Sequence, residues 1–321
     1  MDRLRPKGRK TMKTHDYLGP RRAGGRPLFW VSLSIVLGSM LFGLRCGGPE
    51  LDLKDVPGLL VKKMETLSQM RISLLKSVDA EKMAVMAVTD KASQDFADQS
   101  LQAAQAVNHD RQVFGRLVEK DSTAQEMKVL REFDACWTEF QKIDQVLLKF
   151  AVGNSNIKAA QLSFSQGNEA ITRFEKALMD VIPSHPSADK DSRLMGLAYT
   201  AITAGLKIHY LHAPHIAAAN DNQMDKIEAD IRQYEGEIKK SLTLLTPLVP
   251  EKNQAAIREA KKAYDQLTAL TSKVIELSRQ NDNIKSFELS LGRKRKVTAQ
   301  CDEILISLQE AVRSRTFKAT R

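Results

Sequence analysis

The feature that most constrains this fold is a repeat between the two halves of the chain. The segment 154–158 reads Asn-Ser-Asn-Ile-Lys, and the segment 281–285 reads Asn-Asp-Asn-Ile-Lys. Apolar positions around these turns also align, so that Trp137 meets Tyr264 at the same offset. Any two amphipathic helices share apolar spacing, so the matching turns carry the argument. The sequence therefore predicts two copies of one unit, residues 57–182 and 188–315.

The second constraint is helical periodicity over residues 57–315. Apolar residues recur at three- and four-residue steps, and few Gly or Pro residues interrupt them. The strongest stop is Pro183-Ser184-His185-Pro186-Ser187, and Pro214 predicts a kink. We expect six helices, over residues 57–119, 123–152, 157–181, 188–248, 250–279 and 284–314.

The long-short-short order of these helices, given twice, predicts an architecture. A helix of about 60 residues is near 90 Å long, about twice the length of its neighbours. Each long helix would therefore pass through two four-helix bundles stacked end to end. Short turns between bundle helices make neighbours antiparallel, so the polar turns near 154 and 281 should reverse the chain. The expected fold class is all-α, from an internal duplication, after one N-terminal transmembrane helix.

The N-terminal residues have the pattern of a membrane-targeting segment. Residues 1–27 form a basic arm, and Leu28 to Leu44 follow without a charge. Seventeen residues give about 26 Å of helix, enough for a thin bilayer. The positive charge precedes the apolar run, so the N-terminus should stay cytoplasmic and the rest, after a linker at 45–56, should be periplasmic. An uncleaved signal anchor in the inner membrane is favoured, because no small-x-small cleavage site follows. Lipidation at Cys46 is an alternative, although Arg45 departs from a lipobox. A buried core helix is the third.

Charge and motifs limit the classes of function. Residues 1–45 contain ten basic and two acidic residues, so most of the net charge of +10 lies in the arm. The remainder is nearly neutral, which argues against a nucleic-acid groove. Three cysteines exclude a disulfide-dense scaffold. The chain has no P-loop, dinucleotide fingerprint, HExxH or GxSxG motif. We expect no enzyme, no catalytic residues and no cofactor.

Residues 80–182 carry a family resemblance. The segments AEKMAVMAVTD and EFDACWTEFQKIDQVLLKFAVGNSNIKAAQLS resemble the four-helix-bundle sensor domain of methyl-accepting chemotaxis receptors. The two-storey arrangement over residues 55–315 also looks like the helical bimodular sensor of such receptors. The resemblance implies sensing or binding, and related sensors pair as homodimers. Such receptors continue into a second membrane helix and a signalling hairpin, whereas the C-terminal residues here, ending in tail 316–321, contain no apolar run.

Four residues are weak candidates for ligand contact. His209 and His212 are three residues apart and could share a helix face, as ligand contacts or for one metal. The alternative is that they are polar residues around Pro214, and we predict no metal site. Lys294 interrupts an apolar seam and could meet a carboxylate ligand, or its stem could snorkel to solvent. Trp137 could line a pocket, although a core aromatic layer is commoner.

Two cysteines beyond the arm need a separate interpretation. Cys136 and Cys301 fall in different predicted bundles, so each is expected to be a small buried hydrophobe, not a bonded thiol.

The predicted function is a membrane-anchored extracytoplasmic sensor-like protein. It would bind a small organic ligand or a partner protein, such as a signalling protein, in a helical bundle. The alternative is a structural or scaffolding bundle of the cell envelope without a small-molecule ligand. Buried polar groups facing a cavity would favour the first, and uniformly apolar seams the second.

Overall fold

The computed structural model describes residues 56–182 and 189–319, and every regular element in these ranges is helical. The predicted all-α class is confirmed for this part of the chain. The predicted basic arm (1–27), membrane span (28–44) and Cys46 lie outside the described residues. Among the described helices, none is both long and apolar enough to span a bilayer.

The elements follow the chain in a fixed order. They are α1 (Val56–Met86), α2 (Asp90–Lys120), α3 (Ala124–Gly153), α4 (Ser155–Leu162), the π-helical turn η1 (Ser163–Gly167), α5 (Asn168–Met179), α6 (Asp189–Ala217), α7 (Asp221–Leu245), the 3-10 turns η2 (Thr246–Leu248) and η3 (Glu251–Asn253), α8 (Gln254–Gln280), α9 (Asp282–Leu289), the π-helical turn η4 (Ser290–Lys294) and α10 (Arg295–Ala319).

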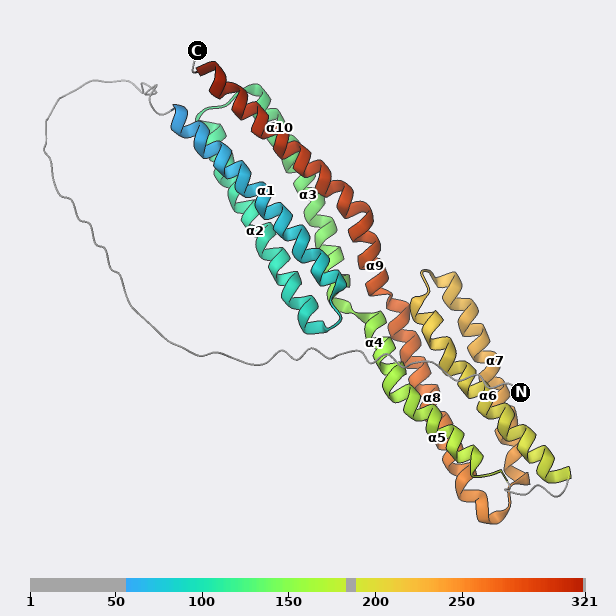
Figure 1. Ribbon diagram of the computed structural model, residues 1–321. Coiled ribbons are helices and arrows are strands. Elements are labelled where there is room, and N and C mark those ends of the chain that lie inside the picture. The colour runs from blue at the N-terminus through green and yellow to red at the C-terminus, as the bar shows by residue number, and fades with distance from the viewer. Residues whose placement is uncertain (1–55, 183–188, 320–321) are drawn as a thin grey trace, which may run out of the picture. The chain divides into compact units, whose positions relative to one another are not determined.

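The two predicted long helices are helical hairpins, which corrects the sequence interpretation. The first breaks between Met86 and Asp90, and α2 packs back along α1 (Figure 1). Thr89 caps α2 by accepting a hydrogen bond from the backbone N–H of Ala92, 3.2 Å away. Asn220 caps α7 in the same way through the N–H of Gln223. These caps start new helices inside an otherwise continuous apolar pattern, and α6 runs through Pro214.

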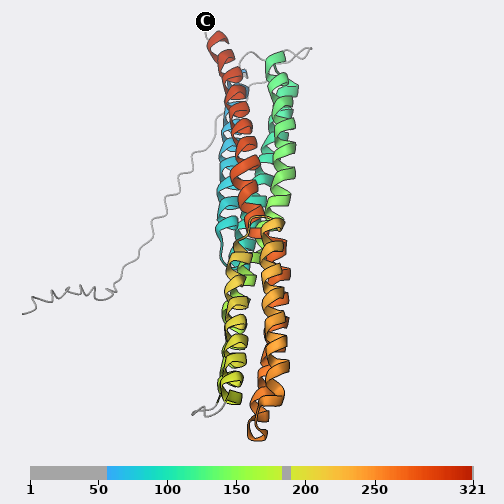
Figure 2. The same ribbon diagram turned by 90° about the vertical axis from the view of Figure 1, so that its right-hand side faces the viewer.

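The asparagine turns do not reverse the chain, a second correction. Asn154 and Asn281 are the non-glycine residues with positive φ in the described chain, at 51° and 56°. Each is a single left-handed residue that interrupts a helix, and the chain continues onward. Figures 1 and 2 show α3 leading into α4 and α5, and α8 leading into α9 and α10. A left-handed residue costs less for Asn than for most side chains, which explains the residue type.

The helices form two groups with separate cores. Helices α1, α2, α3 and α10, here called the first bundle, surround a core that includes Phe114, Phe133 and Leu305. Helices α5, α6, α7 and α8, the second bundle, surround a core that includes Phe174 and Leu267. The predicted long helices do not pass through both bundles. The rods α3–α5 and α8–α10 do so instead.

A disulfide joins the two rods inside the first bundle. Cys136 of α3 and Cys301 of α10 are bonded, with their Cα atoms 5.7 Å apart. The expectation of two unbonded thiols was wrong, because it placed α3 and α10 in different bundles.

Candidate functional site

The rods meet at the two left-handed asparagines, where a reciprocal set of hydrogen bonds holds them. The backbone N–H of Asn156 donates to Oδ1 of Asn283, and the N–H of Asn283 donates to Oδ1 of Asn156, both at 3.2 Å. The Asn156 amide also donates to Oδ1 of Asn281 at 2.9 Å, and the Asn283 amide to Oδ1 of Asn154 at 3.0 Å. Each of these contacts has a counterpart in which the residues 127 positions apart exchange roles, so the junction is pseudo-symmetric.

A buried polar cluster lies beside this junction in the first bundle. Lys294 of η4 forms an ion pair with Asp144 of α3, and both side chains are at most 4% exposed. The Lys294 ammonium also lies 3.2 Å from the ring centre of Phe140, a cation–π contact. Glu81 of α1 completes the cluster and is fully buried. Desolvation raises the pKa of Glu81, while the Ser290 hydroxyl and the Lys294 charge oppose that rise.

The matching cluster in the second bundle is built from neutral groups. His212 of α6 is 1% exposed and lies 2.9 Å from Oγ of Ser163 and 3.1 Å from Oγ1 of Thr271. Burial, together with repulsion from neighbouring His209 and His215, lowers the pKa of His212 to about 4. His212 is therefore neutral at physiological pH, and the two hydroxyls satisfy its ring nitrogens.

The two clusters occupy equivalent positions. The offset of 131 places His212 opposite Glu81, and the offset of 127 places Thr271 opposite Asp144. The same offset places Ser163 opposite Ser290 and Gly167 opposite Lys294. Both clusters therefore combine one residue from a hairpin helix, one from a rod and two from a π-helical turn. Such turns inside α-helices are often found at functional sites.

A pocket opens to the surface beside the second cluster. It has a volume of about 350 Å³ and lies between α4 and η1 on one side and α6 on the other. Phe164 and Tyr210 line it and are 82% and 76% exposed, which is unusual for aromatic side chains. Its polar lining comes from His209 and Ser163. The volume falls within the range of small-molecule sites.

The hydrogen bonds fix the state of His209 in this pocket. Its Nε2 lies 3.2 Å from the backbone oxygen of Ser163, which can only accept, so Nε2 carries the proton. In the neutral ring, Nδ1 is then an acceptor. The ring packs 3.5 Å from the position that a Cβ of Gly167 would take. A lysine at this position, as in the first bundle at 294, would compete with the imidazole for this space.

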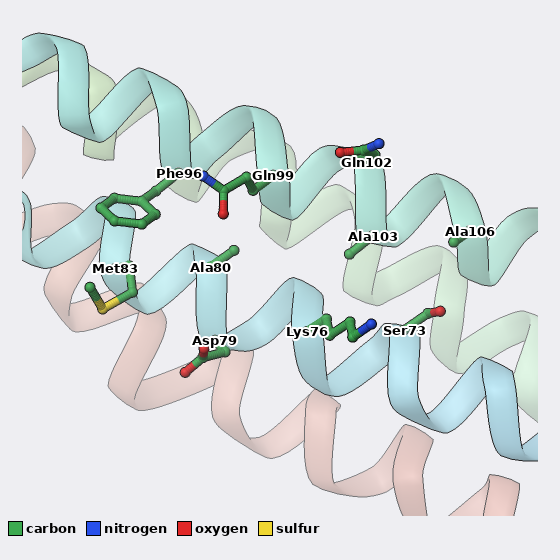
Figure 3. A pocket seen from close by; sticks show the side chains of 10 residues that line it. All are labelled: Ser73, Lys76, Asp79, Ala80, Met83, Phe96, Gln99, Gln102, Ala103 and Ala106. Atoms are coloured by element: carbon green, nitrogen blue, oxygen red, sulfur yellow. The ribbon is translucent and has the colours of Figure 1, made fainter. Parts of the chain in front are cut away.

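A larger groove lies on the outer face of the α1–α2 hairpin. Its volume is about 460 Å³, and Figure 3 shows that its lining comes from α1, including Lys76 and Met83, and from α2, including Phe96 and Gln99. Every charged side chain of this groove is exposed. It therefore lacks the buried polar anchors that the α4–α6 pocket has.

The structure separates the four predicted site residues. His209 lines the pocket and His212 lies behind it, with ring centres 5.5 Å apart. Trp137 is in the core of the first bundle, stacked on Phe140 at 4.6 Å, and its Nε1 donates to Asn108. Among the described residues, no group of three or more His, Cys, Asp or Glu side chains could hold a metal ion.

Lys294 differs from both interpretations of the sequence. Its side chain is 1% exposed, so the solvated, snorkelling position was wrong. Its ammonium is already paired with Asp144, so it is not placed as an unpaired cation for a carboxylate ligand. Desolvation lowers the pKa of Lys294, with Asp144 opposing that change.

Sequence reasoning missed Glu81, Asp144, Phe164 and Tyr210. For the first two, the repeat offsets contained a signal, because they align with His212 and Thr271 at positions that face a bundle interior. For the exposed aromatics Phe164 and Tyr210, the spacing of apolar residues gave no signal. It indicates on which face of a helix a residue lies, but not whether a neighbouring helix covers that face.

Comparison with known proteins does not identify a family for this chain. No protein-family model, no curated protein and no solved structure matches this chain.

Proposed function

We propose that this chain is a membrane-anchored extracytoplasmic sensor-like protein that binds a small organic ligand and performs no catalysis. The ligand site is the pocket between η1 and α6. The observation that carries the proposal is the pairing of two strongly exposed aromatic side chains, Phe164 and Tyr210, with a polar wall made of buried Ser163 and half-buried His209. A soluble surface gains nothing from exposing two rings at one pocket unless something covers them.

The chemistry of the pocket indicates a class of ligand. Phe164 and Tyr210 offer ring faces, which favour an aromatic or other planar apolar group. His209 offers Nδ1 as an acceptor, because its Nε2 proton is committed to Ser163. The ligand is therefore a small aromatic molecule with an N–H or O–H donor. Carboxylates are disfavoured, because the pocket lining contains no cationic side chain.

Internal duplication accounts for the architecture that this site uses. Each repeat supplies one hairpin and one rod, and each rod spans the junction to join the hairpin of the other repeat. The reciprocal Asn156–Asn283 hydrogen bonds support this origin. The resemblance to chemoreceptor sensor domains is consistent with it, and parallel pairing of two chains remains part of the proposal.

Export across the membrane is the remaining part of the proposal. The apolar run at 28–44 after a basic arm favours a single-pass anchor with its N-terminus in the cytoplasm. The Cys136–Cys301 disulfide supports this, because such bonds persist in oxidising compartments such as the periplasm.

One observation favours the alternative function of a scaffolding bundle. The outer face of α1 exposes Val61, Ile72, Leu75 and Met86, all at least 45% exposed. An apolar ridge of this kind suits contact with another protein. It lies on the other bundle from the pocket, so the two functions can be tested separately.

Thermal unfolding of the full-length chain with four probes tests the ligand proposal. Indole and phenol carry an aromatic ring and a donor, benzoate carries an aromatic ring and a carboxylate, and cyclohexane carboxylate has neither an aromatic ring nor a donor. A ligand at 100 times its dissociation constant stabilises the folded state by about 2.7 kcal/mol. We expect a melting-temperature rise of about 4–5 °C with indole or phenol alone.

Two alanine variants make the test specific. Phe164→Ala should abolish the shift without lowering the melting temperature of the unliganded protein, because the side chain is exposed. Leu291→Ala is the matched control, since Leu291 is the equivalent exposed residue of η4 and lies in the other bundle from the pocket. A shift that persists in Phe164→Ala, or one produced by benzoate alone, contradicts the proposed site.

A further inference from the structure

The carboxyl group of Glu81 is the strongest unexplained feature of the described chain. Its side chain is fully buried, and neither Oε1 nor Oε2 has a hydrogen-bond partner among the described residues. A buried carboxylate whose oxygens accept no hydrogen bond is costly, because the nearby Lys294 charge and Ser290 hydroxyl offset only part of its lost hydration. The structure must therefore hold Glu81 in a form that avoids this cost.

The neighbours of Glu81 leave one unit of negative charge uncompensated. Asp144 reaches it from α3 and Lys294 from η4, and these two already neutralise each other as an ion pair. Lys82 on its own helix is exposed. Helix α2, packed along α1, contributes only the hydroxyls of Ser93 and Ser100 as buried polar side chains. With Glu81 ionised, the cluster would carry a buried net charge of minus one.

We propose that Glu81, Asp144, Ser290 and Lys294 form a buried proton-binding site, with one proton held on Glu81. The proton comes from solvent and converts the carboxylate to a neutral carboxylic acid. Its O–H then becomes a donor, and the Ser290 hydroxyl, which influences the pKa of Glu81, is a candidate acceptor. A metal cation is a poor occupant, since the Lys294 ammonium already lies within the cluster.

The second bundle supports this assignment by comparison. Its equivalent cluster pairs His212 with two hydroxyls and carries no net charge. Both bundles thus place a neutral titratable group at the same position beside the junction. The two groups respond to pH in opposite directions. Glu81 becomes charged when it loses a proton, and His212 becomes charged when it gains one. This site is independent of the ligand pocket in the second bundle.

The variant Glu81→Gln in the full-length chain tests the proposal, because glutamine mimics the protonated acid. A native-state pKa above the unfolded value means that stability is complete at low pH and is lost as pH rises through that window. Within the window, the wild-type unfolding equilibrium constant should rise up to tenfold per pH unit relative to Glu81→Gln. We expect Glu81→Gln to be the more stable protein at pH 8.

Glu126→Gln is the matched control. Glu126 is equally buried in the first bundle, but it is paired with Lys63 at 2.7 Å and with Arg315 at 3.2 Å. Its replacement should make unfolding easier at pH 8, the opposite sign. If Glu81→Gln also destabilises at pH 8, or if its difference from wild type does not change with pH, Glu81 is ionised and the proposal fails.

Infrared spectroscopy gives a second readout that does not depend on stability. With carbon-13 in the glutamate side chains, the wild-type protein at pH 7 should show the carbonyl stretch of a protonated acid. Glu81→Gln should lack this band and Glu126→Gln should retain it. A spectrum in which wild type and Glu81→Gln do not differ would overturn the assignment.

Discussion

The two bundles have the same backbone plan, but the polar side chains that they bury beside the junction differ in chemistry. Beside the junction, the first bundle buries Glu81, Asp144 and Lys294, whereas the second buries His212 and Thr271. One interior depends on an ion pair and a proton, and the other on neutral hydrogen bonds. The comparison teaches that the π-helical turns, not the charges, are the common element that makes room for polar side chains.

The difference extends along the core. Cys136 and Cys301 are bonded in the first bundle, and the equivalent positions in the second are Ala263 and Phe174. Phe174 is fully buried, and its ring centre lies 6.0 Å from that of Tyr264. A covalent link between the rods in one bundle therefore corresponds to a packed aromatic ring in the other.

Removal of the disulfide should have the largest effect. The variant carrying both Cys136→Ala and Cys301→Ala frees a loop of 165 residues in the unfolded chain. Loop-closure entropy for this length predicts a loss of about 5 kcal/mol in unfolding free energy. Urea unfolding of the oxidised protein and the double variant measures this loss. An unchanged midpoint would show that the bond does not hold the first bundle together.

The sequence allowed the helical class and the position of both asparagine breaks to be predicted. The polar turns at 154 and 281 stand out because asparagines interrupt long apolar periods in both. The direction of the chain after each break could not be predicted. One left-handed residue between two helices and a reversing turn of several residues have the same composition, and only packing decides between them.

The hairpins were missed for a different reason. Thr89-Asp90 and Asn220-Asp221 are N-cap pairs, but the apolar period continues on both sides of them. A continuous period is expected when both helices of a hairpin face the same core. Because the hairpins were not recognised, the prediction placed α3 and α10 in different bundles. It therefore missed the disulfide between them.

The candidate site was predicted in part. His209 and His212 stand out as a cluster in the sequence, and the structure places one in the pocket wall and the other behind it. The pocket itself depends on Phe164 and on the π-helical turn. Neither the turn nor the exposure of the ring could be predicted from the apolar spacing, which reports only the face of a helix.

Loss of the buried cation should show how far the first bundle depends on charge. Lys294→Met preserves the length of the side chain but leaves Asp144 buried without its partner. We expect a loss of about 4 kcal/mol in unfolding free energy at pH 7. Urea unfolding of the purified chain measures it.

The equivalent change in the second bundle provides the comparison. Thr271→Val preserves shape and removes the hydroxyl near Nε2 of His212. Its cost should be about 1 kcal/mol, since one neutral hydrogen bond is lost. Equal losses from Lys294→Met and Thr271→Val would mean that the ion pair adds nothing beyond an ordinary polar contact.

The pH dependence of the second bundle should have an effect between those of Lys294→Met and Thr271→Val. Burial lowers the pKa of His212 to about 4, below the ordinary value of 6.5 that applies when the chain is unfolded. The stability is therefore complete above pH 6.5 and is lost as pH falls towards 4, because the unfolded chain binds the proton first. The loss should approach about 3 kcal/mol.

The variant His212→Gln isolates this effect, since glutamine can hydrogen-bond but does not titrate in this range. Urea unfolding at pH 7 and pH 4 should show a smaller loss in His212→Gln than in wild type. His109→Gln, which replaces an exposed histidine of the first bundle, should behave like wild type. If His212→Gln loses as much stability as wild type, the acid sensitivity lies elsewhere. The second bundle would then respond to pH no differently from a bundle with an apolar interior.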